Sequence, residues 1–84
     1  MHVSVEISLY PLDQQYIPPI QDFIDRLKAY DDLKVIGNTM STQVYGDYAR
    51  VLEVVSAEMQ RTHRETPKAA FVMKVLNGDL SPDA

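Results

Sequence analysis

The chain has 84 residues, of which 45% are hydrophobic and 24% are charged, and its formal net charge at pH 7 is −4. This length fits one domain, and the composition is that of an ordinary folded domain rather than of a disordered segment. The acidic balance argues against a nucleic-acid surface, which needs a basic stripe. There is no cysteine, which excludes disulfide frameworks, thiol nucleophiles and cysteine zinc sites.

Location and assembly follow from length and hydropathy. No apolar run approaches the ~18 residues of a membrane span, and no signal peptide precedes the first predicted strand, so we expect a cytoplasmic protein. A domain this short buries only ~60–65% of its unfolded surface, and self-association is therefore expected. His2 and His63 have no acidic or histidine partner at ligand spacing, so no metal site is predicted.

Residues 3–10 alternate strictly between apolar and polar side chains, which predicts a β-strand with one buried face. Pro11 should end this strand because it cannot donate to a sheet ladder. The predicted buried face consists of Val3, Val5, Ile7 and Leu9. The opposite face consists of Ser4, Glu6, Ser8 and Tyr10, a surface suited to a small polar, cationic ligand.

An amphipathic helix is predicted after Pro18 and Pro19, since proline is tolerated in a first helical turn. The helix should end near Tyr30, and Asp22 and Arg26 should form an i, i+4 pair on its outer face. Its apolar stripe, at i, i+3, i+4 and i+7, is Ile20, Phe23, Ile24 and Leu27.

Two further strands are predicted over residues 33–36 and 39–45. Gly37-Asn38 between them is a hairpin or bulge signal, because both residues tolerate positive φ. Gly46 is expected to stop the third strand. The residues of that strand that share a face are Ser41, Gln43 and Tyr45.

A second helix and a last strand complete the predicted domain. Asp47 is a good N-cap, and the helix should fade over residues 61–64. The last strand is predicted over residues 70–76, the domain over residues 1–78 and a polar tail over residues 79–84. The helix stripe consists of Tyr48, Val51, Leu52, Val55 and Met59, and we expect Met40, Met59 and Met73 in the core.

The β-α-β-β-α-β order predicts an α+β fold, a ferredoxin-like sandwich with a four-stranded antiparallel sheet and two helices on one face. The first and third strands then lie side by side at the centre, which places Glu6 and Ser8 beside Ser41 and Gln43. The face without helices mixes hydroxyl, aromatic and aliphatic side chains, which is typical of a ligand or partner surface. We expect the open faces or the edge strands of two copies to meet.

Three segments resemble the YkoF-like thiamine-binding protein family. They are VSVEISLYPL at residues 3–12, Tyr16-Ile17 before the first helix, and MSTQVYGD at residues 40–47. The resemblance covers nearly the whole chain. It implies a ferredoxin-like domain that binds thiamine or its hydroxymethylpyrimidine portion without catalysis and without a cofactor. It also implies assembly into a dimer or tetramer and a link to thiamine-precursor uptake or buffering.

The resemblance assigns binding roles to the first strand and to the stretch from Asn38 to Tyr45. In the family pattern, a small residue and a threonine are followed by an acidic residue before the glycine. Ser41-Thr42 fits this pattern, and Tyr45 stands in place of the acid. The candidate ligand-binding residues are Glu6, Ser8, Asn38, Ser41, Thr42, Gln43 and Tyr45.

The chemistry of an aminopyrimidine fits these residues. Glu6 can accept a hydrogen bond from the exocyclic amine, and the hydroxyls of Ser8, Ser41 or Thr42 can complete the set. The thiazolium cation is favoured by an acidic protein and by stacking on an aromatic ring. The rings available for this stacking are Tyr10, Tyr45 and Tyr48.

Structural roles and other function classes remain open for the same residues. The structural alternatives are an ion pair between Glu6 and Lys74, serines that permit close sheet packing, and a plain turn at Gly37-Asn38. One alternative function is a homo-oligomeric interaction or regulatory module with no small ligand. A less favoured one is a small dimeric ferredoxin-like enzyme, for which the sequence offers no nucleophile, base or cofactor motif.

Overall fold

The computed structural model describes residues 1–38 and 40–82. The elements follow in the predicted order: β1 (His2–Pro11), α1 (Ile17–Lys28), β2 (Lys34–Gly37), β3 (Thr42–Asp47), α2 (Tyr48–Glu65) and β4 (Ala69–Asn77). Thr39, expected at the start of the third strand, and residues 83–84 of the expected tail lie outside the described residues. No helix within the described ranges is long and apolar enough to cross a membrane.

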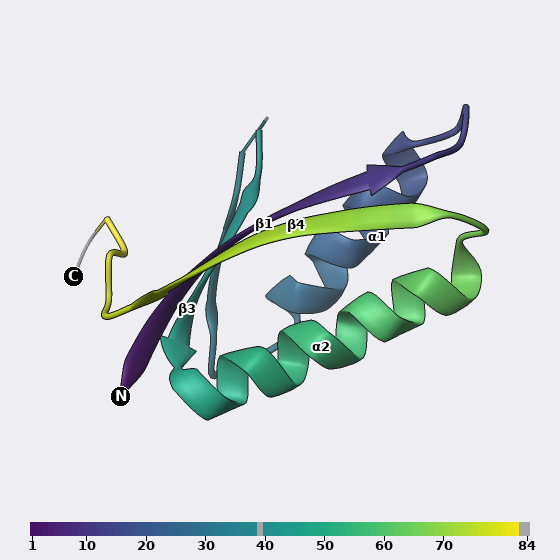
Figure 1. Ribbon diagram of the computed structural model, residues 1–84. Coiled ribbons are helices and arrows are strands. Elements are labelled where there is room, and N and C mark those ends of the chain that lie inside the picture. Colours follow the sequence, from purple (N-terminus) through teal and green to yellow (C-terminus); the bar gives the residue numbers. More distant parts are fainter. Residues whose placement is uncertain (39, 83–84) are drawn as a thin grey trace.

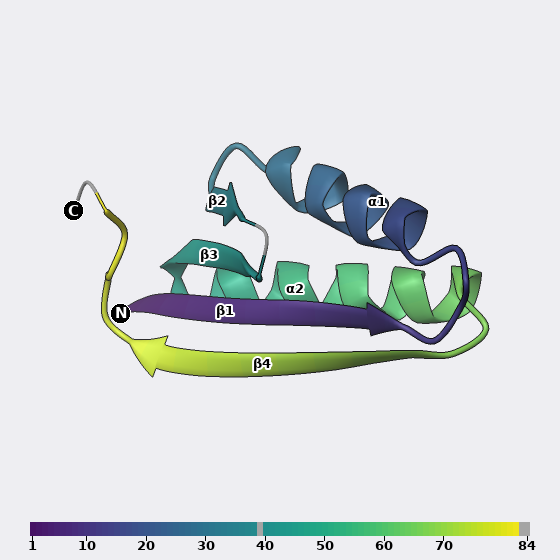
Figure 2. The same ribbon diagram turned by 90° about the horizontal axis from the view of Figure 1, so that it is seen from above.

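The four strands form one antiparallel sheet in the order β2-β3-β1-β4, with both helices against the same face (Figures 1 and 2). At the centre, Val5 of β1 lies opposite Val44 of β3 on one side and Val75 of β4 on the other. The predicted ferredoxin-like topology, with β1 and β3 adjacent at the centre, is confirmed.

The core lies between the sheet and the helices. As predicted, the apolar side chains of β1 form part of it. Met73, which was expected in the core, lies on the edge strand β4 and is 39% exposed. Tyr48 and Met40, also expected in the core, are exposed as well. Tyr48 is the first residue of α2 and Met40 lies in the β2–β3 loop, so neither reaches the packed layer. The buried cluster consists of Val3, Val5, Ile7, Leu9, Phe23, Leu27, Leu33, Val44, Val51, Val54 and Val55.

Gly46 lies inside β3 rather than at its end, opposite Val3 of β1. A Cβ atom at this position would lie 3.0 Å from Leu33 Cδ2 and 3.2 Å from Val51 Cγ2. The glycine therefore lets β3 approach α2 and the segment before β2 closely. This is a packing role, where the sequence pattern suggested a strand terminator.

β2 and β3 form the antiparallel hairpin that Gly37-Asn38 predicted, but neither of these residues has a positive φ. Among the described residues, only Gly78 has a positive φ, of 114°. Instead, the Asn38 side-chain oxygen accepts hydrogen bonds from the backbone N–H groups of Met40 and Ser41, each at 2.9 Å. The asparagine side chain thus satisfies the loop backbone.

A polar network links the two helices. Arg26 Nε donates to Asp22 at 2.9 Å, the predicted pair, and its guanidinium also reaches Glu58 and Thr62 of α2. The hydroxyl of Tyr30 donates to the other Glu58 carboxylate oxygen at 2.7 Å. Burial alone would raise the pKa of Glu58, but the hydrogen bonds from Tyr30 and Arg26 outweigh it and hold that pKa below its ordinary value.

Candidate functional site

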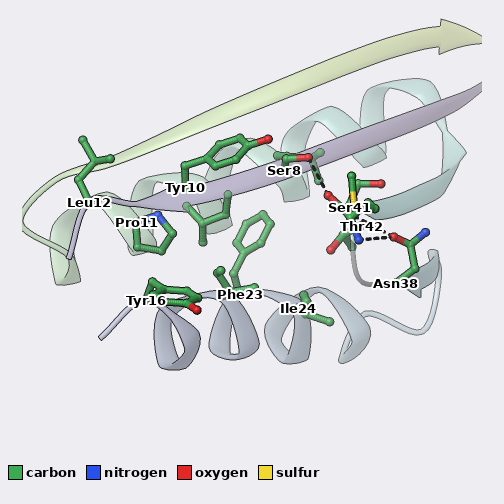
Figure 3. A pocket seen from close by; sticks show the side chains of 14 residues that line it. Ser8, Tyr10, Pro11, Leu12, Tyr16, Phe23, Ile24, Asn38, Ser41 and Thr42 are labelled. Carbon is green, nitrogen blue, oxygen red and sulfur yellow. Dashed lines mark hydrogen bonds between the residues drawn. The ribbon is translucent and has the colours of Figure 1, made fainter. Parts of the chain in front are cut away.

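The candidate site forms where β1 extends beyond the end of β3. β1 has ten residues and β3 has six, and their pairing ends with Ile7 opposite Thr42. Residues 8–11 of β1 continue beside β4. The space past the end of β3 is a cavity of about 440 Å³ between β1, α1 and the β2–β3 loop, which we call the notch (Figure 3).

The walls of the notch differ in chemistry. Figure 3 shows Phe23 and Ile24 rising from α1 on one side, with Ser41 and Thr42 at the loop end. The volume falls within the range of small-molecule sites, which are commonly apolar with a few polar groups. The apolar lining is Ile7, Leu9, Tyr10, Pro11, Leu12, Tyr16, Ile20, Phe23, Ile24 and Met40. The polar lining is Ser8, Asn38, Ser41 and Thr42.

A second depression of about 310 Å³ adjoins the notch on the helix-free face, and we call it the sheet-face hollow. It is lined by Glu6, Ser8, Tyr10, Met40, Ser41, Val72 and Lys74. Four of these residues, Ser8, Tyr10, Met40 and Ser41, also line the notch. The two depressions are therefore neighbours that share these four lining residues.

Glu6 lines the sheet-face hollow, and its carboxylate has two partners there. Ser41 Oγ donates to Glu6 Oε2 at 3.0 Å, and Lys74 Nζ lies 3.3 Å from Glu6 Oε1. The hydrogen bond from Ser41, followed by the hydrogen bond and charge of Lys74, lowers the pKa of Glu6 below its ordinary value. Glu6 is therefore ionised at neutral pH. Its pairing with Lys74 inside the sheet is also the structural role that the sequence left open.

The predicted site residues divide between the two faces of the sheet. Glu6, Ser41 and Gln43 lie together on the helix-free face, where Glu6 is opposite Gln43. Thr42 is buried on the helix side, opposite Ile7, and contributes to the notch only. Ser8 lines both depressions, and its hydroxyl is 3.4 Å from the Met40 carbonyl oxygen.

The aromatic rings considered for stacking are also separated. Tyr10 lines both depressions and is 53% exposed. Tyr45 is buried, and its hydroxyl donates to the Gln43 side-chain oxygen at 3.0 Å. Tyr48 follows Asp47, which pairs with His2 at the opposite end of β1 from the notch. Of these three rings, the structure brings Tyr10 alone to the notch.

The segment after β4 covers the far end of the helix-free face. Ser4 Oγ donates to the Gly78 carbonyl oxygen at 2.7 Å and accepts from the Leu80 N–H at 2.9 Å. Ser4 is consequently buried. Figure 2 shows this segment passing the N-terminal end of β1. The hydroxyl of Ser4 therefore holds the C-terminal segment, while the Ser8 end of the same face stays open.

Tyr16 and Phe23 line the notch but were not predicted as site residues, and Met40, which lies in the stretch from Asn38 to Tyr45, was expected in the core. Phe23 carries a helical core signal, and Tyr16 and Met40 carry no local signal of a site. The difference in length between β1 and β3 is the feature that identifies these residues as part of the notch. Within the described ranges, no cluster of three or more His, Cys, Asp or Glu side chains is placed to hold a metal ion.

A search with models of protein families gives no match to this chain, and a search of curated proteins gives none. Solved structures do match. A protein of Streptococcus pneumoniae superposes with a TM-score of 0.87 over 99% of this chain and 94% of its own, at 19% identity. A candidate thiamine biosynthesis/salvage protein of Thermotoga maritima gives a TM-score of 0.83 over 93% of this chain and 85% of its own, at 14% identity.

A hypothetical protein of Methanocaldococcus jannascii gives a TM-score of 0.80 over 99% of this chain and 87% of its own, at 22% identity. At such low sequence identities, structural similarity shows a shared fold but does not identify a ligand. The chain is thus similar in fold to these proteins, one of which is named for thiamine biosynthesis or salvage, and it is itself a ferredoxin-like βαββαβ domain.

Proposed function

We propose that this protein binds thiamine or its hydroxymethylpyrimidine portion without catalysis. The observation that carries the proposal is the junction at Ser41, where an aromatic-lined notch meets an ionised carboxylate. The ligand class itself comes from the resemblance of residues 3–12, 16–17 and 40–47 to the YkoF-like thiamine-binding family, and one protein of the same fold is named for thiamine biosynthesis or salvage. Buffering of thiamine or support of precursor uptake in the cytoplasm, by a dimer or tetramer, belongs to this proposal.

The ligand fits the two depressions in a defined way. A planar aminopyrimidine packs in the notch against Tyr10 and Tyr16, and its edge reaches the hydroxyls at the loop end. Its exocyclic amine donates to Glu6, which takes over part of the hydrogen bonding that Ser41 and Lys74 now supply. Charge-assisted hydrogen bonds of this kind are stronger than neutral ones, so Glu6 provides most of the polar recognition.

A thermal-shift titration tests the ligand class. The panel contains thiamine, its phosphates, hydroxymethylpyrimidine and a sugar as a negative control. At a ligand concentration ~100 times the dissociation constant, binding stabilises the folded state by ~2.7 kcal/mol, which raises Tm by about 10 °C in a domain of this size. A saturable shift with the aminopyrimidines alone is the expected result. The absence of any shift favours the interaction module.

Calorimetric titration of variants locates the site. Glu6→Gln keeps the size of the side chain and removes its charge, so affinity should fall by about tenfold or more. Glu65→Gln is the matched control, because Glu65 is also an exposed glutamate in an ion pair, with Arg61 at 3.2 Å, and lies outside both depressions. Equal affinities for the two variants would remove Glu6 from the site.

The Thr42→Val variant distinguishes ligand binding in the notch from ligand binding on the helix-free face. Valine keeps the shape of threonine and removes the hydroxyl that lines the notch. Weaker binding in this variant places the ligand in the notch. Unchanged affinity in Thr42→Val together with a loss in Glu6→Gln would place the ligand on the helix-free face, where Glu6 lines both the sheet-face hollow and a depression of about 350 Å³ beside Gln43 and Tyr45.

A further inference from the structure

The candidate site contains one carboxylate and one ammonium group, those of Glu6 and Lys74. The notch is lined by apolar and neutral polar residues, and the sheet-face hollow adds these two charged side chains. The depression of about 350 Å³ beside Gln43 and Tyr45 has the same two in its lining. Among the described residues that line these three depressions, the formal charges therefore cancel before a ligand binds.

The two charges already form an ion pair. Lys74 Nζ lies 3.3 Å from Glu6 Oε1, while Ser41 Oγ donates to the other carboxylate oxygen at 3.0 Å. Glu6 lies opposite Lys74 in the register of β1 and β4, so the backbone holds the pair together. A carboxylate has about four acceptor positions, and these two donors occupy two of them. Glu6 can therefore accept from a ligand amine, whereas an anionic group would meet Lys74 with a carboxylate beside it.

A second lysine on the helix-free face lies in acidic surroundings. Lys34 of β2 is opposite Tyr45 and lines a separate depression together with Asp31, Asp32 and Asp79. The chain as a whole has a formal net charge of −4. An anionic group on a ligand therefore meets an unfavourable field from this end of the face as well.

We propose that the site accepts the free alcohols, hydroxymethylpyrimidine and thiamine, and rejects their phosphate esters, with Glu6 as the residue that sets this specificity. The inference rests on the proposed function and adds the chemical form of the ligand. A phosphate monoester carries about −1.5 to −2 charges at pH 7. Phosphorylation of hydroxymethylpyrimidine thus turns a neutral ligand into an anion that competes with Glu6 for Lys74.

Solvent exposure sets the size of this discrimination. The Glu6 side chain is 42% exposed and that of Lys74 is 81% exposed, so water and salt screen both charges. We expect hydroxymethylpyrimidine phosphate to bind about tenfold more weakly than hydroxymethylpyrimidine. The loss should be smaller between thiamine and its monophosphate, because the thiazolium cation offsets part of the added charge.

Calorimetric titration of the wild-type chain with hydroxymethylpyrimidine and its phosphate, at low and at high salt, tests the charge effect. The gap in affinity should narrow with salt, because the Debye length falls from ~30 Å at 0.01 M to ~3 Å at 1 M. Rejection of the phosphate by its size alone would not depend on salt, so a constant gap would overturn the role of charge. Equal affinities at low salt would overturn the inference and leave the proposed function intact. Binding of neither compound would refute the proposed function, and the inference with it.

Glu6→Gln should change the two affinities in opposite directions. Hydroxymethylpyrimidine should bind more weakly, because its amine loses a charged acceptor. The phosphate should bind several-fold more tightly, because Lys74 is released from its carboxylate partner. A structural role for Glu6 would weaken both ligands, so a fall in both affinities overturns the inference. Glu65→Gln is again the matched control, since Glu65 lies outside these depressions.

Val72→Lys tests the same specificity without altering Glu6. Val72 lines the sheet-face hollow, lies opposite Ser8 and is 58% exposed, so a lysine there adds a second ammonium group to the site. Val75→Lys is the matched control, because Val75 is 43% exposed on the same strand but lies opposite Val5, on the helix side. Hydroxymethylpyrimidine phosphate should bind Val72→Lys several-fold more tightly than Val75→Lys. Equal affinities would show that the charge of the site does not decide, and would overturn the inference.

Discussion

Arg26 of α1 and Glu58 of α2 form an ion pair across the two helices, with side chains only 11% and 12% exposed. The same guanidinium donates to the Glu58 carbonyl oxygen at 3.1 Å and to Thr62 Oγ1 at 2.7 Å. One side chain of α1 thus makes three contacts with one stretch of α2. This relationship fixes how the helices lie against each other, and through α1 it fixes one wall of the notch.

Replacing Arg26 should destabilise the fold strongly. Arg26→Met keeps the apolar stem but leaves the Glu58 carboxylate with a reduced set of partners in a nearly buried position, at an expected cost of about 2–4 kcal/mol. Arg61→Met is the control, because its ion pair with Glu65 is exposed and should be worth at most ~1 kcal/mol. Urea denaturation of both variants measures the difference. Similar losses for the two would contradict a special role for Arg26.

Glu58 should make the stability of the fold sensitive to acid. Its pKa in the folded state lies below the ordinary value of 4.5, so the carboxylate stabilises the fold above that value. This contribution is lost as the pH falls through the lowered pKa. The free energy of unfolding of Glu58→Gln should therefore change less below about pH 4.5 than that of the wild type. The free energy of unfolding of both proteins can be measured by urea denaturation at a series of pH values. The same pH dependence in the two proteins would contradict this role of Glu58.

Gly46→Ala should destabilise the fold by about 1–3 kcal/mol, because its Cβ would overlap Leu33 and Val51 in a packed region. Gly37→Ala provides the comparison in the neighbouring strand. The nearest atom to its Cβ would be Ile24 Cγ2 at 3.7 Å, an ordinary contact. Thermal unfolding should show a clear fall in Tm for the first variant and little change for the second. A reversal of this order would show that the sheet shifts to admit the methyl group.

Asp47→Ala should cost about 1 kcal/mol, since Asp47 Oδ2 accepts the Arg50 N–H at 3.1 Å and caps α2. Asp47→Asn should retain most of the stability, because asparagine caps as well as aspartate does. Chemical denaturation followed by the helical circular dichroism signal measures both. An equal loss in the two variants would mean that the charge matters more than the cap.

The sequence predicted the fold because its signals are local. Alternation in residues 3–10 identified the buried face of β1, and Asp47 marked the start of α2. The same local logic failed at Gly46, where the glycine serves contacts with Leu33 and Val51 that come from other elements. A residue type that ends strands in one context permits close packing in another.

The site was predicted less completely, for a physical reason. Glu6 and Ser41 were placed together correctly, because alternation and topology suffice for that pair. The notch depends on where β3 begins relative to β1, and no residue pattern encodes that offset. Arg26 and Glu58 are 32 positions apart, and their contact follows from helix packing.

The notch exists because one strand is longer than its neighbour, and not because the interior is hollow. Ser8, Tyr10, Tyr16 and Met40 all line it and all lie outside the buried cluster. Substitutions at these four positions should therefore change which small molecule is accepted while leaving the free energy of unfolding almost unchanged. A domain with this arrangement can evolve, or be engineered, toward new ligands without repacking its interior.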